Sequence, residues 1–215
     1  MMTTGTQPKV SVIIPVYNGE EFISECMDSV ISQTLKEIEI FVVDDGSKDK
    51  TPSILKRYAR RDNRIRVITQ KNGGAGAARN NALQYVTGKY LSILDADDFF
   101  EPNMLETAYK KAEETEADVV VFRCDNFNTE TKEYYPCTYS IRENLLPKTQ
   151  PFAGTDIPKD AFRLFVGWAW DKLFRTEYIK ENGFYFQEQR TTNDLLFVFS
   201  AIIKAKRIVT MDDLL

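Results

Sequence analysis

Residues 90–98 read Tyr-Leu-Ser-Ile-Leu-Asp-Ala-Asp-Asp, an apolar run that ends in three carboxylates. This segment constrains the fold more than any other, because a protein can bury Ile93 and Leu94 together only where the segment lies inside a sheet. The acids then project from the carboxyl edge of that sheet, where open α/β folds bind their ligands. The segment therefore predicts a buried strand with a binding site at its end.

Asp95 and Asp97 are the predicted metal ligands at this edge. They are one residue apart in the sequence, so both can turn oxygens toward one point. Unpaired carboxylates repel one another, and a hard divalent cation that carries a substrate phosphate removes that cost. The alternative is helix capping by Asp97 or Asp98. Capping explains one or two of the acids, so we predict a metal and phosphate site.

Strand and helix patterns alternate through the first part of the chain. Compact apolar runs predict strands over residues 10–15, 38–43, 64–69, 90–94 and 118–123, and helical spacing predicts helices over residues 20–34, 51–61, 72–86 and 102–115. Such alternation is typical of a parallel sheet covered by helices on both faces.

The regular alternation of strand and helix patterns ends after Phe122. Residues 125–150 mix aromatic and polar types and predict a β-ribbon or an irregular insertion. Further on, we expect helices over residues 157–165, 176–182 and 193–204, a strand within 168–174 and another from Ile208. No linker is visible, so residues 1–215 are expected to form one domain. The abrupt end leaves open that a C-terminal segment is missing.

Composition excludes several classes of function. A net charge of −4 argues against a general nucleic-acid binder. The absence of histidine excludes an imidazole base and every histidine-bearing metal site. Three cysteines without metal-type spacing suggest reduced thiols in a cytoplasmic protein. No apolar stretch approaches the roughly 18 residues that span a bilayer, so any membrane contact is expected to be peripheral.

Polar loops follow the first and second predicted strands. After the first strand, Tyr17 and Asn18 could stack on a base and hydrogen-bond to it, although Tyr17 could instead cover the core. After the second, Asp44 or Asp45 could accept a hydrogen bond from a base or a ribose hydroxyl. The alternative there is a helix cap by Asp45 or Ser47.

A glycine-rich loop, residues 72–76, opens the third predicted helix. Its small residues let the backbone approach a ligand, and a helix N-terminus favours anions. Gly74 and Gly76 match only part of a dinucleotide fingerprint. Arg79, one turn into the helix, could reach a phosphate or pair with a surface acid.

Together, four motifs resemble the family 2 glycosyltransferases of the GT-A fold. They read VSVIIPVYN, VDDGS, NGG followed by ARN, and LDADD, and the resemblance covers residues 10–110 closely. It implies a mostly parallel Rossmann-like sheet with helices on both faces, plus a C-terminal region with mixed strands. Residues 1–122 would form the nucleotide-sugar-binding half and residues 123–215 the acceptor-binding half.

The activity that this resemblance implies is an inverting transfer of a sugar from a nucleotide diphosphate sugar. A UDP-sugar is the expected donor, and a hydroxyl of a saccharide or a lipid-linked saccharide is the expected acceptor, in polysaccharide or cell-surface glycan assembly. Asp97, with Asp95, would bind Mg²⁺ or Mn²⁺. Two carboxylates are too few to hold such an ion alone, so we expect tight metal binding to require the nucleotide. The expected nucleotide-binding residues are Pro15, Tyr17, Asn18, Asp44, Asp45, Asn72, Arg79, Asp95 and Ala96.

An acceptor hydroxyl must lose a proton as it attacks, and without histidine a carboxylate must take it. Asp194 stands where similar enzymes carry this base, preceded by Asn193 in place of the usual Glu. Helix capping is the alternative for Asp194. The segment Trp-Asp-Lys-Leu-Phe, residues 170–174, resembles a family segment in which Asn is common at the second position. Trp170 and Asp171 are therefore expected to bind the acceptor, with core packing as the alternative for Trp170.

Two rival functions remain open. A sugar-nucleotide nucleotidyltransferase would be expected to carry a glycine-rich loop with Arg or Lys after its first strand, which residues 16–19 lack. A non-catalytic sugar-nucleotide-binding module is the other. The aromatic residues of 127–139 could shape the choice of acceptor or form a homodimer surface. We expect no nucleic-acid partner and leave open a peripheral contact with the inner face of the plasma membrane.

Overall fold

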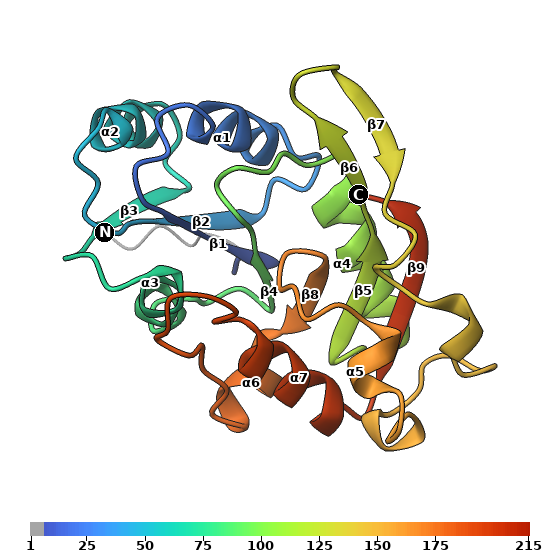
Figure 1. The fold of residues 1–215 in the computed structure, drawn as a ribbon. Helices are drawn as coiled ribbons and strands as arrows, with labels where there is room; N and C mark the ends of the chain where they lie inside the picture. The colour runs from blue at the N-terminus through green and yellow to red at the C-terminus, as the bar shows by residue number, and fades with distance from the viewer. Residues whose placement is uncertain (1–6) are drawn as a thin grey trace.

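The computed structural model describes residues 7–215, and residues 1–6 of the polar start lie outside the described part. Seven strands form one sheet in the order β3-β2-β1-β4-β8-β5-β9 (Figure 1). β8 runs antiparallel to both of its neighbours, and the other neighbouring pairs are parallel, as predicted. The strands are β1 (Val10–Val16), β2 (Ile38–Asp44), β3 (Ile65–Thr69), β4 (Tyr90–Ile93), β5 (Val119–Arg123), β8 (Lys172–Arg175) and β9 (Ile208–Leu214).

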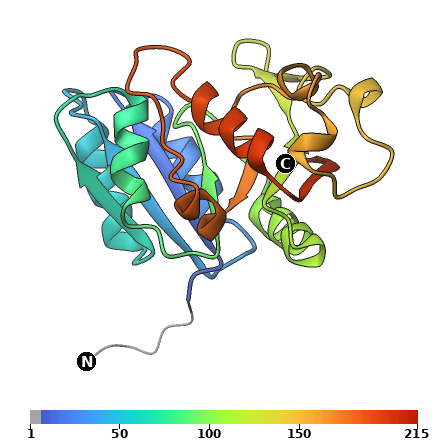
Figure 2. The same ribbon diagram turned by 90° about the horizontal axis from the view of Figure 1, so that it is seen from below.

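Helices cover both faces of this sheet (Figures 1 and 2), which confirms the predicted architecture. One apolar core packs α1, α2 and α4 against the sheet, and a second core packs α3, α6 and α7 against the opposite face. Within residues 7–215 no helix is both long and apolar enough to cross a bilayer. The helices are α1 (Ile23–Ile31), α2 (Thr51–Arg61), α3 (Ala75–Leu83), α4 (Met104–Thr115), α5 (Ala161–Leu164), α6 (Thr176–Glu181) and α7 (Leu195–Lys204).

The predicted ribbon is present as β6 (Asp125–Asn128) and β7 (Glu133–Pro136), two antiparallel strands beside the main sheet. Short 3₁₀ turns follow as η1 (Glu143–Leu145) and η2 (Gly154–Asp156). The helix expected over residues 157–165 is wrong in length, because α5 makes a single turn. The chain leaves that turn at Phe165 to form a β-bridge with Ile141, so tertiary pairing overrides the helical pattern.

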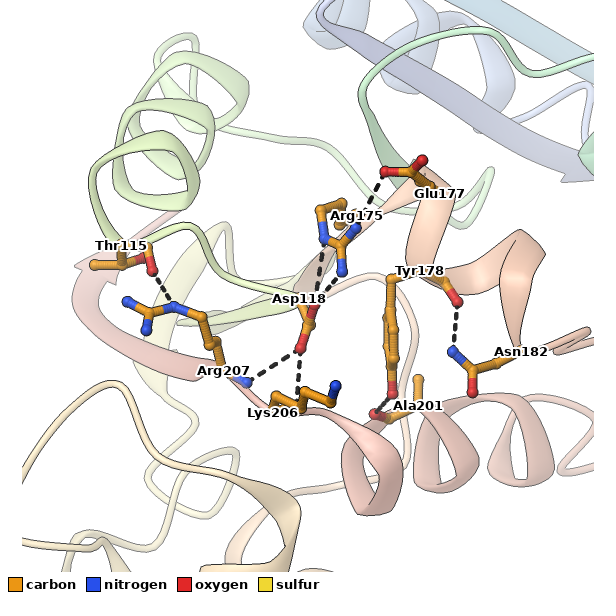
Figure 3. A network of polar contacts seen from close by, with 9 residues as sticks. All are labelled: Thr115, Asp118, Arg175, Glu177, Tyr178, Asn182, Ala201, Lys206 and Arg207. Atoms are coloured by element: carbon orange, nitrogen blue, oxygen red, sulfur yellow. Dashed lines mark hydrogen bonds and ion pairs between the residues drawn. The ribbon is translucent and has the colours of Figure 1, made fainter.

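A buried carboxylate, Asp118, joins the C-terminal half to the sheet (Figure 3). Its Oδ1 accepts hydrogen bonds from the Arg175 guanidinium on β8, and its Oδ2 accepts from the backbone N–H groups of Lys206 and Arg207 before β9. Arg207 also donates from Nε to the carbonyl oxygen of Thr115 at the end of α4, at 2.7 Å. The network therefore sets β5, β8 and β9 side by side.

Candidate active site

The loops after β1 and β2 lie against each other at the carboxyl edge of the sheet. Asn18 donates its backbone N–H to Ser47 Oγ at 2.9 Å, and its Oδ1 accepts from the backbone N–H of Lys48 at 2.8 Å. Asp44 is buried and accepts from the backbone N–H of Ser47. Tyr17 keeps 49% of its surface exposed, so its ring is accessible to a planar ligand. The side chains of Asn18 and Asp44 thus shape the loop in which Tyr17 is presented.

Three other predicted nucleotide-binding residues border this edge. Pro15 is buried in β1 and lies in register with Val43 of β2. Asn72 is exposed at the start of the glycine loop. Ala96 is half-buried and packs on the core between the two aspartates of the β4 loop. These positions fit contacts made by backbone and small surfaces, and they remain predictions.

Asp45 acts differently from the prediction. It is buried, and its carboxylate accepts hydrogen bonds of 2.8 Å each from Gln70 Nε2 and from the backbone N–H groups of Gly73 and Gly74. These are the donors that an anion would otherwise meet at the start of α3. The structure therefore gives Asp45 the role of anchoring the glycine loop, in place of the predicted contact with a nucleotide.

Arg79 links the N-terminal part of this edge to the C-terminal part. It is buried on α3 and pairs through Nη2 with Asp95 Oδ1 and through Nη1 with Asn193 Oδ1. Its guanidinium also lies over the ring of Phe186, 5.2 Å from the centroid. The predicted partner was a phosphate or a surface acid, and the acid that it contacts belongs to the site itself.

The carboxylates after β4 differ in their surroundings. Asp95 is turned toward Arg79, Asp98 is half-buried, and Asp97 is exposed. Burial raises the pKa of Asp95, Arg79 opposes that effect, and the charges of Asp97 and Asp194 add to it. Burial, then the charges of Asp95 and Asp97, raises the pKa of Asp98 to about 7. The cluster thus concentrates negative charge at the predicted position.

These acids fit a metal that receives part of its coordination from a substrate. Within residues 7–215 no group of three or more acidic or thiol side chains forms a complete metal site. Asp97 is exposed, whereas one oxygen of Asp95 is occupied by Arg79. Mg²⁺ characteristically binds one or two carboxylates and takes its remaining ligands from phosphates and water. The donor set therefore suits a cation that arrives with a diphosphate.

Asp194 lies at the start of α7, where the capping alternative placed it. Its backbone oxygen accepts from the N–H of Val198, but its carboxylate makes no side-chain capping hydrogen bond. Its charge contributes to raising the pKa of both Asp95 and Asp171, so it shares one electrostatic environment with the β4 acids. The structure thus brings together Asp194, Asp95 and Arg79 from three distant segments.

The two predicted acceptor-binding residues separate in the structure. Trp170 is half-buried, stacks on Trp168 at a centroid distance of 4.8 Å and lines a cavity next to Asp97. Asp171 has no exposed surface and forms an ion pair with Lys172. Burial raises the pKa of Asp171 to about 6, against the lowering effect of Lys172. The prediction that Asp171 contacts the acceptor is therefore wrong for this conformation.

Sequence reasoning missed Asn193 and Phe186 as partners of Arg79. Asn193 was noted only as a departure from the usual Glu, and nothing in the sequence joins it to Arg79, 114 residues earlier. Phe186 was not singled out at all. The one available signal was Asn193, a polar residue next to the predicted base. It indicated the right part of the chain but not the contact with Arg79.

Comparison with known proteins assigns the chain to a family. The sequence profile of glycosyl transferase family 2 matches residues 11–200, so the chain belongs to this family. The chain is 34% identical over 207 residues, 96% of its length, to the uncharacterized glycosyltransferase EpsJ of Bacillus subtilis. It is 44% identical over 188 residues, 82% of its length, to the glycosyltransferase GlyA of Streptococcus pneumoniae. It spans 59% of the former and 26% of the latter.

A solved crystal structure is similar in fold to this chain. The crystal structure of Staphylococcus aureus TarS residues 1–349 in complex with UDP-GlcNAc superimposes with a TM-score of 0.78 at 29% identity, covering 95% of this chain and 56% of that one. TarS bears the name poly(ribitol-phosphate) beta-N-acetylglucosaminyltransferase. The similarity confirms the predicted GT-A fold.

Proposed function

We propose that this chain transfers a sugar from a UDP-sugar to a hydroxyl of a saccharide or lipid-linked saccharide, with inversion, in the assembly of polysaccharide or cell-surface glycan. The observation that carries the proposal is the bridge of Arg79 between Asp95 after β4 and Asn193, the residue that directly precedes Asp194. Asp194 makes no side-chain capping hydrogen bond, so helix capping does not occupy the carboxylate that we assign as the base. Family membership and the UDP-GlcNAc complex of TarS support the donor class.

The chain's own residues supply three actions. Tyr17 offers an exposed ring on which the base stacks, beside the loop that Asn18 and Asp44 shape. Arg79 holds Asp95 in place and fixes Asn193, which positions the following base. Asp194 accepts the proton of the acceptor hydroxyl while its oxygen bonds to the anomeric carbon. The bond from that carbon to the diphosphate oxygen breaks in the same step, so the configuration inverts and a nucleoside diphosphate leaves.

Asp97, with a contribution from Asp95, would hold Mg²⁺ or Mn²⁺ beside the diphosphate. When bound, the cation would neutralise the charge that develops on the leaving oxygen. Asp97 is exposed and has the freedom to meet such a complex. Arg79 pairs with Oδ1 of Asp95, so Oδ2 is the oxygen that Asp95 would contribute.

Release of nucleotide from a panel of UDP- and GDP-sugars, with and without Mn²⁺, tests the proposal. We expect turnover of a UDP-sugar that depends on the metal. The variant Asp194→Asn should lose about a hundred- to ten-thousand-fold in transfer while donor binding persists, because only the base is removed. Near-normal transfer by Asp194→Asn would remove this residue from the mechanism.

This assay, a donor-binding measurement and a pyrophosphate assay together separate the rival functions. Donor binding without any turnover, across all the donors and acceptors tried, would indicate a non-catalytic binding module. Release of pyrophosphate from a nucleoside triphosphate and a sugar phosphate would indicate a nucleotidyltransferase. The variant Glu114→Gln is the matched control for Asp194→Asn, because Glu114 is an exposed acid on α4, outside this site.

A further inference from the structure

A cavity of about 680 Å³ adjoins the β4 acids on the side of α1 and the ribbon. Its wall runs from the start of α1 through the loop that follows Asp97 to β6 and β7, and then to Trp170 and the end of β9. The cavity is continuous with the proposed site, because Asp97, the proposed metal ligand, belongs to its lining.

Aromatic rings form much of this wall. Phe99 lies edge-on to Phe127 at a centroid distance of 5.2 Å, and Phe127 lies 4.9 Å from Tyr134. Tyr134 and Tyr135 remain 59% and 50% exposed on the ribbon. Rings of this kind present an apolar face together with a polar edge, which matches the C–H faces and hydroxyl groups of a pyranose.

The charged groups of the cavity are almost all negative. Its lining holds one cationic side chain, Lys132, and six carboxylates, which are Glu21, Glu25, Asp97, Asp98, Glu101 and Asp125. Without Asp97 and Asp98, which a metal would compensate, four carboxylates still face one lysine. A ligand that carries phosphate or carboxylate groups would meet like charges here, and such juxtaposition is a strong means of rejecting a ligand.

We propose that this cavity binds the acceptor as an uncharged saccharide and that its carboxylates reject acceptors carrying phosphate or carboxylate groups. The inference rests on the proposed glycosyl transfer and names the acceptor class for it. It also distinguishes this chain from TarS, whose name specifies a poly(ribitol-phosphate) acceptor.

Binding can be tested separately from turnover. The sequence contains two tryptophans, and one of them, Trp170, lines the cavity. An uncharged disaccharide added with UDP and Mn²⁺ should change the tryptophan fluorescence of the wild type. Most of that change should be lost in Trp170→Phe, and a smaller part should remain from Trp168, which stacks on Trp170. The same disaccharide carrying a 6-phosphate should bind about tenfold more weakly or worse at low salt, and the gap should narrow as salt screens the charges.

Charge variants identify the cause of the selectivity. Glu21 and Glu25 are exposed on the cavity wall, so the double variant Glu21→Gln/Glu25→Gln should fold normally. It should bring the affinities for the two disaccharides closer by several-fold while leaving that for the uncharged one nearly unchanged. The matched control is Glu114→Gln/Glu181→Gln, two exposed acids outside the cavity, which should leave the ratio as in the wild type.

Equal binding of the two disaccharides, or a ratio that the Glu21 and Glu25 substitutions do not alter, would overturn the proposal. A fluorescence change that keeps its full size in Trp170→Phe would place the saccharide elsewhere and overturn it as well. Failure of the proposed transferase activity gives a different result. In that case no UDP-sugar is turned over, whereas selective binding of the uncharged disaccharide is still measured.

Discussion

Arg79 is the residue on which the geometry of the site depends. Its two Nη atoms reach different partners, Asp95 in the loop after β4 and Asn193 before α7. A neutral Asn at position 193 leaves Arg79 with one carboxylate partner in place of two. The cluster around the guanidinium therefore carries one negative charge fewer than it would with the Glu usual in similar enzymes.

Substituting this arginine should damage stability and donor binding together. The variant Arg79→Gln leaves the Asp95 carboxylate without its cation, so we expect the free energy of unfolding to fall by about 1–3 kcal/mol. Affinity for a UDP-sugar should fall as well. Arg79→Lys keeps the charge but cannot reach both partners through a planar fork, so it should recover only part of each loss. Urea denaturation and calorimetry measure the two effects, and wild-type stability in Arg79→Gln would contradict the assignment.

Asp171 predicts a pH dependence of stability. An unfolded Asp titrates near 3.9, roughly, whereas burial raises the pKa of folded Asp171 to about 6. Between these values the folded state binds the additional proton. The contribution of Asp171 to the free energy of unfolding therefore falls as the pH rises through that window, by up to about 1.4 kcal/mol per pH unit, and is constant above it.

The comparison with Asp171→Asn isolates this contribution from other titrating groups. Lys172 also donates hydrogen bonds to the carbonyl oxygens of Val166 and Trp168, and we expect it to keep them in the variant. We expect the unfolding free energy of the wild type minus that of the variant to decrease from pH 4 to pH 6, roughly, and then to level off. A difference that is flat or rises over that interval would show that Asp171 stays ionised in the folded protein.

At the scale of elements, α3 depends on a close approach that only glycine allows. A Cβ at Gly76 would collide with the backbone carbonyl oxygen of Gln187, in the segment that carries Phe186 to Arg79. Gly76→Ala should therefore push this segment away and lower the free energy of unfolding by about 1–3 kcal/mol. Arg79 would lose its ring contact in the process.

The control for this prediction is Gly183→Asn. Gly183 has a φ of +63° and open space around it, and Asn tolerates that conformation. We expect a much smaller loss of stability there, and chemical denaturation compares the two variants directly. Similar losses for both would indicate that glycine content alone, without the contact to Gln187, accounts for the effect at Gly76.

The spacing of apolar residues predicted most helices and strands, because each element buries one face made of residues that are close together in the sequence. β2 and α2 match their predicted ranges to within one residue, and α1 is shorter because residues 19–22 form a turn. The placement of β8 could not be predicted. The pattern of a four-residue strand does not indicate whether the strand runs parallel or antiparallel to its neighbours. Pairing with Tyr90 on one side and Val119 on the other sets β8 antiparallel between β4 and β5.

At the scale of the whole molecule, the site is assembled by topology. Its residues come from α3, the β4 loop and the start of α7, and sequence motifs correctly placed each of these at the end or start of an element. Motifs could not show which polar groups pair with one another. Asp45 accepts hydrogen bonds from the backbone N–H groups of Gly73 and Gly74, a contact between segments distant in the sequence. Asp171 pairs with its sequence neighbour Lys172, and its complete burial is what packing decides.

The charge distribution of the assembled site makes a prediction about coupled binding. The proposed ligands of the cation are Asp97 and one oxygen of Asp95, and the described residues contain no complete ligand set. Mn²⁺ alone should therefore bind weakly, and UDP alone should meet the negative charges of Asp95, Asp97 and Asp98. Together each ligand removes the penalty that the other meets, so each should raise the affinity of the other by the same factor, about 5- to 150-fold.

Calorimetric titrations of UDP with and without Mn²⁺, and of Mn²⁺ with and without UDP, measure both arms of this coupling. Asp97→Asn should abolish most of the coupling factor while UDP alone still binds, because the substitution removes a metal ligand and one repulsive charge. Tight binding of Mn²⁺ to the free protein would contradict the argument, since it would require ligands that Asp95 and Asp97 cannot supply. Coupling that persists in Asp97→Asn would move the cation to another part of the edge.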